Sequence, residues 1–205
     1  MNRMDPGQKI AEINLGKREF YLFTMLFSLV IIFTVRRLAE YWLGIRDSAW
    51  TRLELLGFFG FYLLVIVVHE LLHAFALFCW GKIPAKAIKF GCIWKGLMPY
   101  CEFSGPIKIQ AFRIVLFLPL VCTGLLALVC LWMYPSDWMV ICTGVTIAGS
   151  CGDILVFIKT RKFKGNLFLT GNSSATLGYK IFAPPVEVVT ESEQKESADP
   201  ACEEP

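Results

Sequence analysis

Four long apolar runs occupy much of the 205-residue sequence, and their length constrains the fold more than any other feature. They cover residues 20–35, 55–80, 114–134 and 138–158. Because crossing a bilayer core of about 30 Å takes about 20 helical residues, the last three runs are long enough and the first is short but usable. The mean hydropathy of +0.56 lies beyond the ordinary range of a soluble domain. We therefore predict an all-α integral membrane protein with about four transmembrane helices.

The segments around these runs divide the chain further. Residues 1–19 are polar and are expected to form a cytoplasmic segment, and residues 20–160 the transmembrane domain. Short alternating stretches broken by Pro, Gly or a turn predict strands in two places. One is the loop after the second run, with "AKAIKFG" (85–91) and "PIKIQAF" (106–112), and the other is segment 161–185, on either side of "TGNSS". The acidic tail, 186–205, has the composition of a disordered segment.

The basic residues indicate how the helices are oriented. Sixteen of the 20 Lys and Arg residues lie in the amino-terminal segment, the second loop and the carboxyl-terminal segment, and the other four lie between the first two runs. Since cytoplasmic loops are enriched in Lys and Arg, both termini and the second loop are predicted to be cytoplasmic. This asymmetry also accounts for the net charge of +3. The expected surroundings are a lipid bilayer, and no nucleic-acid partner is expected.

Acidic and basic side chains are almost absent from the runs themselves. The second run contains "HELLH", with His69, Glu70 and His73, which include both histidines of the chain. The fourth run contains Asp153, and the first and third contain none. An ionisable group at the centre of a bilayer costs at least about 2.5–3.5 kcal/mol and so needs a partner or a function. We therefore expect these four groups to interact with one another.

The spacing of the two histidines is that of a zinc site. Four residues apart on a helix, their imidazoles share one face about 5–6 Å apart, and they can hold adjacent corners of a zinc tetrahedron. Glu70 follows one position further round the helix and can act as a general base on a water at the metal. A third protein ligand is needed, and the chain has no third histidine.

Asp153 is the candidate for this third ligand, and Cys151 is the alternative. In the predicted topology the second and fourth helices both run toward the cytoplasm. Depth can be counted from the cytoplasmic end of each helix at 1.5 Å per residue. The histidines then lie roughly 14–20 Å from Lys82, and Asp153 lies about 9 Å from Lys159. Helix tilt can cover this difference. Gly149 and Gly152 are expected to let the two helices approach closely. The eight cysteines otherwise show no paired metal spacing, and a structural His–Glu–His–Asp hydrogen-bond network is the other interpretation of the polar groups.

These residues also carry a resemblance to known proteins. "HELLHAF" followed by a membrane-embedded aspartate is similar to the site-2 protease class of intramembrane zinc metalloproteases. The whole layout over residues 14–185, including Pro119 in the third run and the "GD" at Gly152–Asp153, more closely resembles the small four-helix bacterial membrane proteins called putative zincin peptidases (DUF3267). Site-2 proteases have an Asn-containing motif on the helix of the third ligand, whereas this chain reads "AGSCGDI" and has no Asn there.

The resemblance implies zinc ligands at His69, His73 and Asp153, a catalytic base at Glu70 and a place in the bacterial cell membrane. The predicted function is therefore an intramembrane zinc metalloprotease that hydrolyses peptide bonds of membrane-protein or peptide substrates. The alternative is a non-catalytic zinc-binding or scaffold protein of the membrane.

Overall fold

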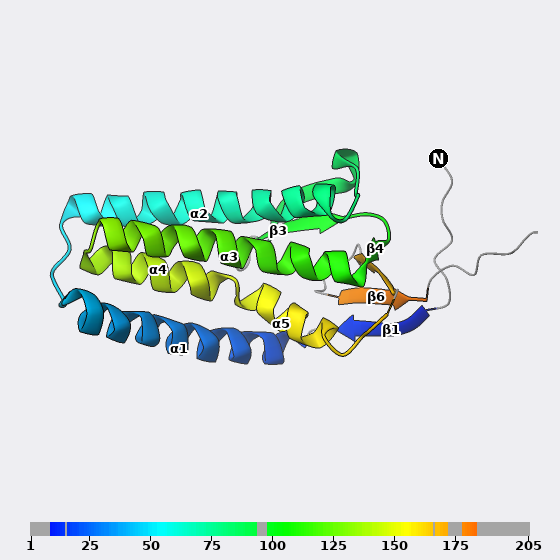
Figure 1. The fold of residues 1–205 in the computed structure, drawn as a ribbon, viewed down its shortest axis with the longest axis horizontal. Helices are drawn as coiled ribbons and strands as arrows, with labels where there is room; N and C mark the ends of the chain where they lie inside the picture. Colours follow the sequence, from blue (N-terminus) through cyan, green and yellow to red (C-terminus); the bar gives the residue numbers. More distant parts are fainter. Residues whose placement is uncertain (1–8, 15, 94–97, 166, 172–177, 184–205) are drawn as a thin grey trace, which may run out of the picture.

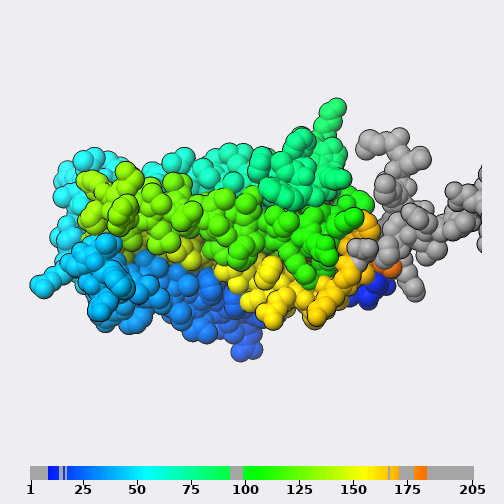
Figure 2. Space-filling view, in the orientation of Figure 1, coloured from blue at the N-terminus to red at the C-terminus, as the bar shows by residue number. Residues whose placement is uncertain are grey.

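The structure is a computed structural model that describes residues 9–14, 16–93, 98–165, 167–171 and 178–183 (Figure 1). The tail predicted to be disordered, 186–205, and most of the predicted turn "TGNSS" lie outside these residues. The molecule is elongated. The face shown in Figure 2 is formed largely by α1 in blue, α3 in green and α5 in yellow.

Five α-helices of the described residues run roughly along the long axis (Figure 1). They are α1 (Lys17–Leu43), α2 (Arg52–Cys79), α3 (Ile109–Met133), α4 (Asp137–Gly149) and α5 (Cys151–Thr160). Only Ser150 separates α4 from α5, so these two helices form one long unit. Within the described residues, four helical segments are long and apolar enough to cross a membrane: Arg18–Leu43, Arg52–Cys79, Ile109–Met133 and Asp137–Thr160.

Local interactions explain where several of these helices begin and end. A capping box starts α2, because the Thr51 hydroxyl accepts a hydrogen bond from the Glu54 backbone N–H and the Glu54 carboxylate accepts one from the Thr51 N–H. Helix α1 ends at Gly44, whose φ of 66° is the left-handed conformation that glycine favours. It continues to Leu43, well beyond residue 35, and the ion pair between Arg36 and Glu40 one turn later contributes to this extension.

Short strands gather at one end of the helical bundle (Figure 1). An antiparallel sheet has the strand order β1 (Lys9–Asn14), β6 (Gly178–Phe182), β5 (Phe168–Gly171) and β4 (Ile107–Lys108). Strands β2 (Ile88–Ile93) and β3 (Met98–Phe103) form a separate antiparallel hairpin, after a short 3-10 turn at Ala85–Ala87. The protein is thus mostly helical but not all-α, because the two ends of the described chain pair in a sheet.

The strand predictions were right in part. Strands β5 and β6 flank residues 172–177 as expected, and β2 lies in the predicted stretch 85–91. The strand predicted at 106–112 is wrong beyond Lys108. The helix α3 begins at Ile109, and Ile109 and Phe112 lie on its buried face. Neither β1 nor β3 was predicted. The sequence of the polar amino-terminal segment does not indicate that it pairs with β6, and β3 contains Pro99, a residue that is uncommon inside strands.

The core at the strand end joins the sheet to the helices. Ile107, Leu169 and Ile181 from three strands are buried to 1% exposure or less, and they pack in one cluster with Leu77 of α2 and Phe112 of α3. By contrast, large apolar side chains on the outer faces of the long helices remain exposed. Examples are Leu22, Met25, Leu29, Phe33, Leu56, Leu63, Leu71, Phe75, Leu125 and Trp132.

Candidate metal centre

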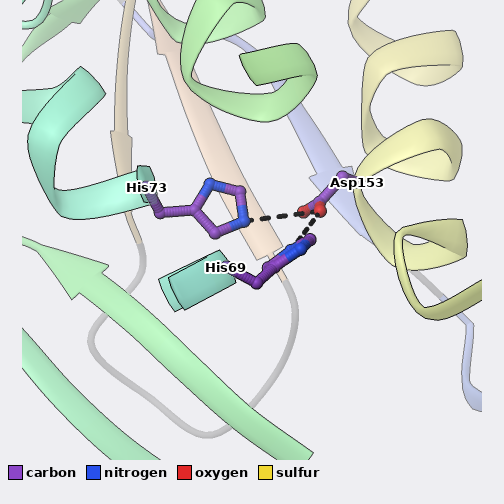
Figure 3. Close-up of side chains that lie close together, drawn as sticks. All are labelled: His69, His73 and Asp153. Carbon is purple, nitrogen blue, oxygen red and sulfur yellow. Dashed lines mark hydrogen bonds and ion pairs between the residues drawn. The ribbon is translucent and has the colours of Figure 1, made fainter. Parts of the chain in front are cut away.

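His69 and His73 lie one turn apart on α2, and their ring centroids are 4.9 Å apart. His73 is buried and His69 is half-buried. Both rings direct Nε2 toward the same carboxylate, that of Asp153 (Figure 3). The predicted sharing of one helix face by the two imidazoles therefore agrees with the structure.

Asp153 comes from the first turn of α5. Its Oδ2 lies 3.0 Å from His69 Nε2 and 3.3 Å from His73 Nε2. The break at Ser150 ends α4 and begins a new helix, so the carboxylate is close to the unpaired N–H groups of a helix amino terminus, where negative charge is stabilised. The structure thus brings Asp153 to two histidines of α2, although it lies 84 residues after His69 along the chain.

A backbone contact fixes the orientation of His73. Its Nδ1 lies 2.9 Å from the Val115 carbonyl oxygen on α3, an acceptor, so Nδ1–H donates this hydrogen bond. In the neutral ring Nε2 then carries a lone pair, and it faces a carboxylate oxygen at 3.3 Å. Two acceptors at that distance repel each other unless a proton or a cation lies between them. Histidines that bind a metal through one ring nitrogen usually donate a hydrogen bond from the other nitrogen to a carbonyl or carboxylate.

The geometry of the three donor atoms fits a divalent cation. One ligand atom from each of His69, His73 and Asp153 lies within 4.8 Å of the other two. Zinc–ligand distances of about 2.0–2.2 Å place the corners of a tetrahedron about 3.3 Å apart, close to the separations of Asp153 Oδ2 from His69 Nε2 and His73 Nε2, 3.0 and 3.3 Å. Two imidazoles and one carboxylate are also a donor set that zinc accepts, with a fourth position left for water or substrate.

Glu70 has a different environment from the other three groups. Its side chain is half-buried, and Oε2 is shielded from solvent without a hydrogen-bond partner among the described residues. The carboxylate therefore does not belong to a closed His–Glu–His–Asp network, which counts against the purely structural interpretation. It is free to accept a proton or a hydrogen bond from a molecule that enters the site.

Cys151, the alternative third ligand, is turned elsewhere. Its thiol donates to the Thr24 hydroxyl of α1, with Sγ and Oγ1 3.4 Å apart. Another expectation proved wrong: a Cβ on Gly149 would meet no heavy atom within 4 Å, so this glycine does not mark a close helix contact. The missing side chain at Gly149 instead leaves open space beside the site.

The site lies in a partly open cavity of about 550 Å³. Residues of all five described helices and of β3 and β6 line it, and most of its lining surface is apolar. The polar lining residues that the sequence did not identify include Tyr100, Cys101, Thr146 and Tyr179. Their neighbours along the chain carry no motif, and only the folding of the strands and of α4 brings them to the cavity.

Two of these residues remain protonated at neutral pH. Burial, followed by the nearby charge of Glu70, raises the pKa of Cys101 to about 12. Burial also raises the pKa of Tyr179 well above its ordinary value, and the negative charge of Asp153 adds to this effect. The cavity therefore presents a neutral thiol and a neutral phenol beside its carboxylates.

Comparison with known protein families agrees with this geometry. Residues 62–168, just over half of the chain, match the family described as "Putative zincin peptidase" (DUF3267). The match includes His69, Glu70, His73 and Asp153, and its family description is that of a zinc peptidase. No curated protein and no solved structure matches the chain. The chain belongs to the DUF3267 family of putative zincin peptidases.

Proposed function

We propose that this protein is an intramembrane zinc metalloprotease that hydrolyses peptide bonds of membrane-associated substrates. The observation that carries the proposal is the convergence of His69, His73 and Asp153 on one point beside the unpaired carboxylate of Glu70. Structural zinc sites have four protein ligands, whereas catalytic sites have three and an open position. The three donor atoms and the adjoining cavity match the second arrangement.

The placement in a membrane is part of the proposal. Its support is the presence of four helical segments of sufficient length and hydropathy, together with the exposed apolar side chains along their outer faces. On a soluble protein, an apolar surface of that extent would cause aggregation. The proposed orientation has both termini and the β2–β3 hairpin on the cytoplasmic side, and the distribution of basic residues supports it. We propose the bacterial cell membrane as its location, which the resemblance to small bacterial membrane proteins supports.

Each residue of the site has a separate role in the proposed hydrolysis. Zinc, when bound, polarises the scissile carbonyl and lowers the pKa of a water toward about 7. Glu70 accepts the proton of the attacking water and delivers it to the leaving amine, as a general base that becomes a general acid. The Val115 carbonyl holds His73 in the tautomer that leaves Nε2 free. Asp153 supplies the negative charge that balances the cation.

Metal analysis of the detergent-purified protein and its variants tests the proposal. We expect about one zinc per chain in the wild type and in Glu70→Gln, because Glu70 is not among the three donors. Cleavage of a panel of single-span membrane proteins should fall about 10²–10⁴-fold in Glu70→Gln, since the general base is lost. Bound zinc without any cleavage above the Glu70→Gln level would favour the non-catalytic zinc-binding protein instead.

A second pair of variants tests the third ligand. Asp153→Ala should lose zinc, because only two donors remain, whereas Cys151→Ala should keep it, because the Cys151 thiol is directed at Thr24. Inductively coupled plasma spectrometry on the folded proteins measures both. Zinc retained in Asp153→Ala and lost in Cys151→Ala would contradict the assignment.

A further inference from the structure

Thr146 of α4 has a buried hydroxyl without a partner. The residue is 4% exposed, and its Oγ1 makes no hydrogen bond to any residue that the structure describes. It nevertheless lines the same cavity as His69 and Glu70. Leaving a buried hydroxyl unpaired costs about 1–3 kcal/mol, so each such group in a native structure calls for an explanation.

The other threonines of the long helices show what is unusual here. A threonine inside a helix commonly donates to the carbonyl four residues earlier. Thr143, one turn before on the same helix, donates to the Met139 carbonyl at 2.9 Å and lies 3.2 Å from that of Ala127. Thr123 of α3 likewise donates to the Pro119 carbonyl at 2.7 Å. Thr146 lacks this bond, so its hydroxyl remains available to a molecule in the cavity.

The cavity around Thr146 has the form of a groove between α1 and α2. Helix α1 packs on α4 and α5, and α2 packs on α3 and α4, so α4 forms the floor of the groove. Thr146 and Gly149 lie on this floor, and the space above Gly149 is open. The wall on α1 is a stripe with one residue per turn: Phe20, Thr24, Ser28 and Ile32.

The chemistry of the groove suits an extended peptide. A helical segment uses its own N–H and C=O groups, whereas an extended segment presents them unpaired, and in an apolar groove each needs a partner. A threonine hydroxyl can both donate and accept. We propose that Thr146 is a substrate-binding residue that hydrogen-bonds a backbone group of an extended, apolar substrate segment in the groove between α1 and α2. This inference rests on the proposed function, because it takes the groove as the substrate site of the metal centre.

Two zinc-binding probes separate the contribution of Thr146 from that of the metal. Acetyl-Leu-Phe hydroxamate carries peptide groups, and octanohydroxamate fills apolar space without them. With zinc-loaded full-length protein in detergent, we expect Thr146→Val to raise the Kd of the peptide probe about threefold to tenfold. The Kd of the alkyl probe should stay unchanged, and Thr146→Ser should restore the affinity for the peptide probe. Calorimetric titration measures all of these values.

Thr143→Val is the matched control, with the same substitution one turn away on the same helix. It should lower the Tm, because it removes a hydrogen-bonded hydroxyl, and leave both Kd values unchanged. Thr146→Val should leave the Tm unchanged or raise it. Equal affinity of the peptide probe for wild type and Thr146→Val would contradict the role of Thr146 and leave the proposed metal centre unaffected. If neither hydroxamate bound the wild type, the proposed function would fall, and the role of Thr146 with it.

Discussion

At the scale of the residue, the polar side chains of the cavity differ in whether they have partners. His69 and His73 both contact the carboxylate of Asp153, at 3.0 and 3.3 Å. Glu70 and Thr146 each keep an oxygen without a partner among the described residues, although both are shielded by the protein. Unpaired buried groups of this kind cost stability, so each calls for an explanation. In the proposed function, His69, His73 and Asp153 hold the metal, and Glu70 and Thr146 face the substrate.

Cys101 gives a prediction at this scale. With its pKa raised from 9.0 to about 12 by burial and by Glu70, its thiolate fraction at pH 8 is about a thousandfold lower than that of an ordinary thiol. Native Cys101 should therefore react far more slowly with iodoacetamide than Cys101 of the denatured chain. Peptide mass spectrometry at a series of times measures both rates.

The sign of the pH effect on stability follows from the same shift. Because the folded protein holds the Cys101 proton more tightly than the unfolded chain does, Cys101 does not affect stability below about pH 9, the ordinary pKa. As the pH rises above this value the unfolded chain ionises first, and stability falls. Equal alkylation rates for the native and denatured chains at pH 8 would contradict the raised pKa.

At the scale of the element, two features of α4 and α5 position the site. The interruption at Ser150 divides the last long apolar unit and places Asp153 in the first turn of α5. At the other end of α4, Asp137 lies in the first turn and contacts the guanidinium of Arg36 from α1. It also accepts a hydrogen bond of 2.6 Å from Trp50 Nε1. These contacts connect α4 to the end of α1 and to the loop that follows.

Removing Asp137 should loosen this connection. The side chains of Arg36 and Asp137 are only 13% and 11% exposed, so Asp137→Ala leaves a shielded guanidinium with fewer partners. We expect the free energy of unfolding to fall by about 1.5–3 kcal/mol, the range for hydrogen bonds to charged groups. Unfolding in mixed micelles, followed by circular dichroism, provides the measurement.

Arg37→Ala is the comparison for this prediction. Arg37 pairs with Glu40 on the same helix, but its side chain is 64% exposed. Exposed ion pairs contribute less than about 1 kcal/mol, so this variant should unfold almost as the wild type does. If both variants lost the same stability, burial would not explain the contribution of Asp137.

At the scale of the whole molecule, the long helices and the strands have different surroundings. The outer faces of α1, α2 and α3 carry many exposed apolar side chains, and the strands lie together at one end (Figure 1). In the proposed topology this end faces the cytoplasm, and the loop between α1 and α2 faces the opposite side. The metal centre then lies within the apolar part of the molecule, beside the groove between α1 and α2.

Reporter fusions test this orientation. Alkaline phosphatase, which is active only after export, should be active when fused after Asp47 and inactive when fused after Lys164. Green fluorescent protein at the same two positions should give the reverse pattern, since it fluoresces in the cytoplasm. Active phosphatase at Lys164 together with fluorescence at Asp47 would invert the proposed topology.

The sequence determined the features that depend on local pattern. Four apolar runs marked the four long helical units, because hydropathy and length are properties of a continuous segment. His69, Glu70 and His73 could be selected because acidic and basic groups are rare in such runs, and a spacing of four residues places two side chains on one helix face. Asp153 was one of two candidates for the third ligand.

Only the tertiary structure shows which of these two candidates lies beside the histidines, and only it assembles the cavity. Asp153 meets the histidines while Cys151 is directed at Thr24, a difference set by the break at Ser150 rather than by spacing along the chain. The pairing of β1 with β6 and the unpaired hydroxyl of Thr146 were likewise absent from any local pattern. These features arise from contacts between distant segments, whose energies depend on how the helices and strands pack and not on the composition of any one of them.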